Sequence, residues 1–203
     1  MRKSETLKLE MNALSAVAKK ILHASLSLFP SAVQYGPMDG LHRFKEAQDE
    51  VDFGFECALA EIRSGEKSSH WIWYIFPQIA GLGRSSTAQE YALRDVAEAC
   101  DFLRDATLRE RLITITTAAA AQLQKGVPLE QLMGGETDSS KLVSCMTLFQ
   151  IVAGKADIAG ENPEFANLKR FCGEVLLAAE TQGFPRCQHT INKCADQTSR
   201  KNP

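Results

Sequence analysis

The chain has 203 residues, of which 44% are hydrophobic and 24% charged, as is ordinary for a globular protein with one packed core. With 23 basic and 25 acidic side chains the net charge is −2, which argues against a binder of nucleic-acid backbones, because such proteins usually carry a basic excess. The six cysteines are scattered without a Cys-x-x-Cys pair, which favours free thiols in a reducing compartment. No apolar run approaches the ~20 residues that a membrane span needs. We therefore expect a soluble, cytoplasmic protein.

The first part of the chain stands apart from the rest. In residues 7–22 apolar side chains recur at helical spacing among basic ones, which is typical of an amphipathic targeting segment, although Glu5 and Glu10 argue against that function. Residues 30–40 are rich in proline and glycine and are typical of a linker. We interpret residues 1–37 as an N-terminal extension and linker, with organelle targeting as the alternative to a cytoplasmic location.

Helical patterns begin directly after this linker. Apolar residues in 51–62 share one helical face, with Asp49 as the expected N-cap and Gly65 as the expected stop. Residues 71–76 form the one continuous apolar run that suits a strand, but a lone strand has nothing to pair with. This run is therefore expected to be helical or irregular.

The remaining elements are also expected to be helices. They comprise one or two short helices in 87–105, a longer one from an N-cap at Thr107 to Gly126, a short one from Pro128 to Gly134, one capped by Asp138, and a last one opened by Asn162-Pro163. The fold class is all-α, a single compact domain of about six or seven helices over residues 38–181. Residues 182–203 are polar and are expected to form a C-terminal tail outside the packed domain.

Several motifs carry a family resemblance. Leu41-His42-Arg43-Phe44, the run from His70 through Phe76-Pro77-Gln78 to Gly81-Leu82-Gly83, Lys141-Leu142, and Met146 to Phe149 resemble motifs of the uncharacterised, mainly microbial family catalogued as domain of unknown function eighteen-ten. The resemblance covers about Leu41 to Phe171 and implies a compact all-α domain without an agreed activity, cofactor or partner. The chain departs from the family pattern after Lys141-Leu142, where Val143, Ser144 and Cys145 replace a basic residue and two serines.

Polar residues within these motifs suggest an anion site. A glycine-bearing loop that leads into a helix can present backbone N–H groups to an anion, and histidine is suited to acid–base chemistry near neutral pH. This reasoning predicts a phosphorylated or nucleotide-type small molecule as ligand, with hydrolase or transferase chemistry. The expected catalytic residue is His70, and the expected ligand-binding residues are Arg43, Gln48, Gln78, Gly81, Gly83, Arg84, Lys141 and Ser144.

A structural interpretation of the same residues stays open. Two closely spaced glycines commonly make only a turn, and His70 and Gln78 could serve to satisfy buried polar groups beside a core of aromatic rings. The alternative function is a non-enzymatic interaction or structural domain, so enzymatic activity is not assigned. No cofactor, metal, nucleic acid or membrane is expected as a partner. The three metal-ligand types in the tail, Cys187, His189 and Cys194, are one short of the usual structural zinc set.

Overall fold

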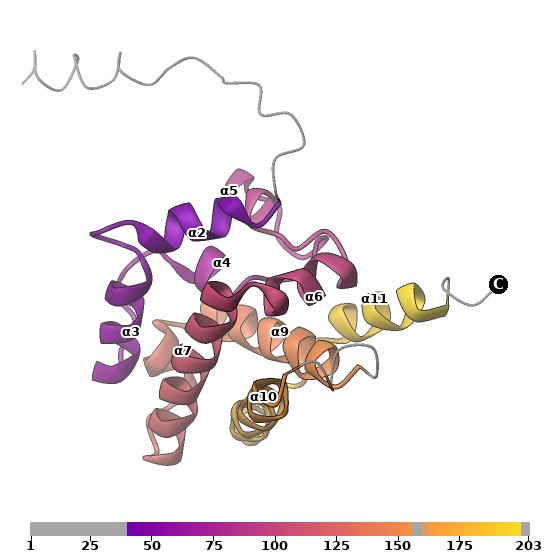
Figure 1. Cartoon of the computed structure of the whole chain (residues 1–203). Helices are drawn as coiled ribbons and strands as arrows, with labels where there is room; N and C mark the ends of the chain where they lie inside the picture. Colours follow the sequence, from indigo (N-terminus) through magenta and orange to yellow (C-terminus); the bar gives the residue numbers. More distant parts are fainter. Residues whose placement is uncertain (1–39, 156–159, 161, 200–203) are drawn as a thin grey trace, which may run out of the picture. The chain divides into compact units, whose positions relative to one another are not determined.

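The computed structural model describes residues 40–155, 160 and 162–199, and this part of the chain is all-helical, as the sequence predicts (Figure 1). Ten helices occur in the described residues, rather than six or seven. Their bounds are α2 His42–Asp49, α3 Phe55–Ser64, α4 Ile72–Ile75, α5 Ser86–Glu90, α6 Val96–Arg104, α7 Ala106–Gln124, α8 Leu129–Met133, α9 Glu136–Ala153, α10 Glu164–Thr181 and α11 Gln188–Ser199.

Helix α9 lies at the centre of this arrangement (Figure 1). Eleven of its eighteen residues are buried, on all sides of the helix, because α10, α8, α11, α6 and α4 all pack against it. Its polar residues Ser139, Ser144 and Thr147 are buried as well, and each has a hydrogen-bond partner. A helix that is buried on every side is expected to be apolar all round, which explains the near-continuous run from Leu142 to Ala153.

The second long helix, α7, lies between α3 and α10 (Figure 1). Leu108, Leu112, Ile115, Ala119 and Leu123 follow its buried side. Asp105 caps its N-terminus by accepting a hydrogen bond of 3.1 Å from the Leu108 amide. The expected cap, Thr107, is therefore wrong by two residues, since it already lies within the first turn.

Two further expected caps are also wrong. Helix α3 begins after Gly54 and not at Asp49, which instead ends α2. Helix α9 begins after Gly135, so Asp138 lies in its first turn, where its carboxylate binds lysines instead of backbone amides. Gly65 ends α3 as expected, in a left-handed conformation with φ of 88° that glycine adopts readily.

The aromatic run contains the one-turn helix α4, in agreement with the expectation of helical or irregular structure. Trp71 and Phe76 are fully buried with ring centroids 6.1 Å apart, whereas Trp73 is only partly buried. The run is followed by an isolated parallel bridge between Ile79 and Leu93, with backbone hydrogen bonds of 2.8 and 2.9 Å.

The segment set apart as a polar C-terminal tail contains α11, which packs against α9. Thr190 and Cys194 of this helix are buried, and His189 contacts the Ala80 carbonyl at 3.2 Å. The expected N-terminal extension, residues 1–37, lies outside the described residues. Every helix of the described part falls short of the length and apolarity needed to cross a bilayer.

Candidate functional site

The loop between α3 and α4 lies across the junction of α8 and α9. Its Lys67 amide donates a hydrogen bond of 3.0 Å to the Leu132 carbonyl. Gly134 has a φ of 72°, and a Cβ at this position would come within 2.7 Å of the Lys67 carbonyl oxygen. The absence of a side chain at Gly134 therefore allows the loop to approach the first turn of α9.

This approach brings two lysines to one carboxylate. Lys67 Nζ lies 2.7 Å from one oxygen of Asp138, and Lys141 Nζ lies 2.8 Å from the other. The Lys67 side chain is 7% exposed, and those of Asp138 and Lys141 are 20% and 21% exposed. Burial opposes the ionised form of Asp138, but the hydrogen bonds and charges of the two lysines outweigh it and lower the pKa of this carboxyl.

An indole ring lies beside each lysine. Lys67 Nζ is 5.1 Å from the centroid of Trp71, and Lys141 Nζ is 4.8 Å from the centroid of Trp73, both within the range of cation–π attraction. We call the group of Lys67, Asp138 and Lys141, with the rings of Trp71 and Trp73, the two-lysine site. Two ammonium groups share one carboxylate there, so this ion-pair set carries one excess positive charge.

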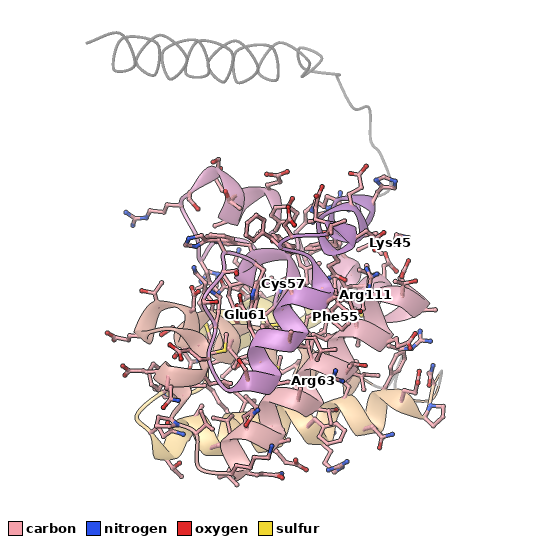
Figure 2. All side chains as sticks on the ribbon, turned by 90° about the vertical axis from the view of Figure 1, so that its left-hand side faces the viewer. Lys45, Phe55, Cys57, Glu61, Arg63 and Arg111 are labelled. Carbon is pink, nitrogen blue, oxygen red and sulfur yellow. The ribbon has the colours of Figure 1, made fainter. Side chains whose placement is uncertain are left out.

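Glu61 holds the same loop from the side of α3. Its carboxylate accepts hydrogen bonds from the amides of Ser68 and Ser69, from both serine hydroxyls and from Trp71 Nε1 at 2.8 Å. Burial raises the pKa of this carboxyl, but these hydrogen bonds prevail and lower it to about 2. Figure 2 shows Glu61 and Cys57 on one side of α3, and the two side chains are in contact at 3.7 Å. Glu61 forms no ion pair with Lys67 or Lys141, so it is a support for the loop and not their counterion.

His70, the expected catalytic residue, lies on this loop and is exposed. Its carbonyl oxygen accepts a long hydrogen bond of 3.5 Å from the Tyr74 hydroxyl. Its imidazole has no hydrogen-bond partner among the described residues. His70 is thus neither buried nor part of a preformed acid–base pair, and it is free to meet a molecule from solution.

Arg43 lies elsewhere, between α2 and α6. It donates hydrogen bonds of 2.9 Å to the Glu98 carboxylate and to the Ala92 carbonyl. Glu98 is almost fully buried and also pairs with Arg94 at 3.1 Å. The two motif cations Arg43 and Lys141 therefore bind different carboxylates on different helices and do not share a partner.

The other expected ligand-binding residues have structural partners. Gln48 is buried, and its side-chain amide donates to the Tyr74 carbonyl at 2.8 Å. Gln78 takes part through its backbone, whose carbonyl accepts from the Leu93 amide. Ser144 is buried, and its hydroxyl lies 3.0 Å from that of Thr190 in α11. These contacts link different segments of the fold, and none of them includes a residue of the two-lysine site.

The glycine-bearing loop also has a packing explanation. A Cβ on Gly81 would lie 3.0 Å from the His189 ring, and one on Gly83 would lie 2.3 Å from Ala88 Cβ. Arg84 is exposed, and its carbonyl accepts a hydrogen bond from Gln89. Both glycines therefore allow neighbouring chain segments to come close, whether or not a ligand also binds there.

Sequence reasoning missed three residues of this region: Lys67, Asp138 as a lysine partner, and Glu61. A signal for one pair was present, because Asp138 and Lys141 are three apart on a predicted helix. Lys67 has no such signal, since it meets Asp138 only through tertiary packing. The tail residues Cys187, His189 and Cys194 form no metal-ligating cluster with other side chains in the part of the chain that the structure describes.

The architecture and the motifs define a class, an all-helical domain of unassigned activity. The sequence profile of the family described as "Protein of unknown function (DUF1810)" matches residues 38–174, and the chain belongs to this family. Its fold is similar to that in the "Crystal structure of the conserved hypothetical protein Rv1873 from Mycobacterium tuberculosis at 1.38 A", with a TM-score of 0.59 and 28% identity over 79% of this chain and 99% of that one. No curated protein matches the chain.

Proposed function

We propose that this protein binds a small anionic metabolite, of phosphorylated or nucleotide type, at the two-lysine site. The observation that supports the proposal is the ratio of charges: Lys67 and Lys141 share the single carboxylate of Asp138 in a site that is about four-fifths buried. An uncompensated charge in a poorly hydrated site is costly, and an anion in contact with Lys141 would remove that cost.

Accessibility decides which groups would meet the ligand. Lys141, Asp138 and Trp73 are partly exposed and His70 is exposed, whereas Lys67 is almost fully buried. Lys141 would therefore contact the anionic group, Trp73 would offer an aromatic face beside it, and Lys67 would hold Asp138 in place. Phosphate and carboxylate groups are the natural partners of an ammonium group, and an indole face suits a planar base.

Hydrolase or transferase chemistry is the further step of the proposal, with His70 as the acid–base residue. Arg43, Arg84, Gly81 and Gly83 remain predictions for ligand binding, to be tested one by one, although the contacts of Arg43 with Glu98 and Ala92 lie outside the two-lysine site. The alternative, a non-enzymatic domain, predicts the same fold with no dependence of any reaction on His70.

A thermal-shift panel of nucleotides, sugar phosphates, nicotinamide dinucleotides and ADP-ribose tests the proposal on the full chain. A ligand present at a hundred times its Kd stabilises the folded state by about 2.7 kcal/mol, which is a readily measured shift in Tm. We expect Lys141→Ala to abolish the shift while the protein stays folded, because Asp138 keeps Lys67 as its partner.

Lys45→Ala is the matched control, since Lys45 also pairs with an aspartate, Asp105, at 2.8 Å, but lies on α2, outside the two-lysine site. A shift that survives Lys141→Ala, or that Lys45→Ala removes equally, would refute the assignment of the site. A panel without any shift would favour the non-enzymatic alternative. For a ligand that binds, turnover lost in His70→Ala with unchanged affinity would support the catalytic role.

A further inference from the structure

A shallow groove of about 610 Å³ follows a partly exposed side of α7, where Ile113 and Ala118 also pack against the edge of the core. Ile113, Thr117 and Ala121 lie along it at intervals of four residues, opposite the buried Ile115 and Ala119. Thr114, Ala118 and the buried Gln122 complete its lining along α7, and Arg63 and Lys125 lie at one end. Figure 2 shows Arg63 at the end of α3, beside the turns of α7. None of these residues belongs to the two-lysine site.

The floor of the groove is uncharged over an unusual length. Residues 112–124 contain no charged side chain, although five of them line the groove and are partly exposed. The outward side of a surface helix normally carries charged and polar residues, so an uncharged side of more than three turns favours contact with another protein surface. Small-molecule sites usually enclose most of their ligand, which a shallow groove does not.

Unpaired charges flank this uncharged surface. Glu110 is exposed and lies one turn before Ile113 on the same side of α7, while Lys125 and Arg63 line the other end of the groove. None of the three forms an ion pair within the described part of the chain. The surface is thus negative at one end, neutral along its length and positive at the other end.

We propose that this groove is a self-association surface on which α7 of a second copy lies antiparallel, about a twofold axis between Thr117 and Ala118. Such an axis places Thr114 of one copy opposite Ala121 of the other, and Glu110 opposite Lys125, because the members of each pair lie equally far from the axis. Charge complementarity between the two ends therefore selects a second copy of this chain, and twofold pairing is the commonest symmetry of protein dimers.

Packing supports the same arrangement. Threonine and alanine side chains are short, so they favour a close approach of a second helix along α7. The contact is limited to one helix pair and the end of α3, so it belongs with small interfaces below about 1,200 Å², which are weak or transient. We expect a dimer with a Kd in the micromolar range.

Sedimentation velocity of the full chain from about 1 μM to about 1 mM tests the proposal. The wild type should show a monomer–dimer equilibrium. Glu110→Lys and Lys125→Glu should each weaken association by roughly tenfold, because each places like charges opposite one another at both ends of the pair. An equimolar mixture of the two variants should associate again, since only the mixed pair restores opposite charges.

Glu130→Lys, an exposed charge reversal on α8, is the control and should leave association unchanged. A wild type that stays monomeric up to about 1 mM would overturn the proposal. A dimer that is equally strong in Glu110→Lys and Lys125→Glu would also overturn it, because another surface would then be responsible. Circular dichroism of both variants checks that they retain the helical fold.

Discussion

Replacing Glu61 by glutamine should destabilise the protein at neutral pH and remove part of its acid sensitivity. The Glu61 carboxylate receives donors from Ser68, Ser69 and Trp71, and glutamine would present an amide group to some of these donors. The loop that carries Lys67 and His70 would thereby lose its attachment to α3.

The magnitude follows from the pKa of Glu61, which the fold lowers from 4.5 to about 2. A carboxyl with a lowered pKa stabilises the folded state above its unfolded-state pKa, and this stabilisation is lost as pH falls through the folded-state value. At about 1.4 kcal/mol for each pKa unit, the shift corresponds to about 3 kcal/mol at most, and to about 1–2 kcal/mol once screening by water is allowed for. The loss should fall between about pH 4.5 and pH 2.

Urea denaturation followed by circular dichroism at several pH values measures this contribution. The difference in free energy of unfolding between wild type and Glu61→Gln should be largest at pH 7 and should shrink as pH falls below about 4.5. Glu56→Gln in the same helix is the control, because Glu56 is exposed. A difference that is the same at pH 7 and pH 2.5 would refute the reasoning, since the charge of Glu61 would then contribute nothing.

Three further substitutions test other parts of the fold. Glu98→Ala removes a buried carboxylate that two arginines share, so the urea midpoint should fall by the equivalent of about 3 kcal/mol. Gly83→Ala sets a methyl group against Ala88 and should lower Tm, with a cost of about 1–3 kcal/mol. Ser144→Ala leaves the Thr190 hydroxyl buried without its partner and should lower the free energy of unfolding by about 1–3 kcal/mol, as measured by urea denaturation. In a double-mutant cycle, Ser144→Ala combined with Thr190→Val should cost less than the sum of the two single changes.

The long helices could be predicted from the sequence because each buries one continuous apolar side. In α7 and α10 the apolar residues recur every three or four positions. The two helices pack against each other, and α10 also packs on α9, which confirms that pattern. Pro128 and Gly134 mark the short helix α8 correctly, although α4, α5 and α8 have five residues or fewer and are too short to show a periodic stripe. Helices α2 and α11 lie in segments for which no helix is expected, and these two explain most of the difference between the expected and the observed number of helices.

Helix α11 is not predicted from the sequence, for a different reason. Its buried positions are held by Thr190 and Cys194, which do not mark an apolar stripe in a segment that is otherwise polar. Cys187, Thr190, Ile191 and Cys194 nevertheless follow the spacing of one helical side, and this weak signal was present in the sequence. The helix docks through a buried hydroxyl pair with Ser144 and through the contact of His189 with Ala80, neither of which a hydrophobic pattern can reveal.

The candidate site divides in the same way between local and long-range information. The spacing of Asp138 and Lys141 is readable along one helix, and such a pair alone would be a neutral ion pair of modest value. Lys67 changes the charge balance of this pair, because a second ammonium group on the same carboxylate leaves one positive charge without a partner. That second contact exists because Glu61 holds the loop on one side and Gly134 lets it approach on the other. The charge of the site is therefore a product of the tertiary fold. If the proposed anion binds there, loosening the loop at Glu61 should weaken its binding, even though Glu61 itself contacts neither lysine.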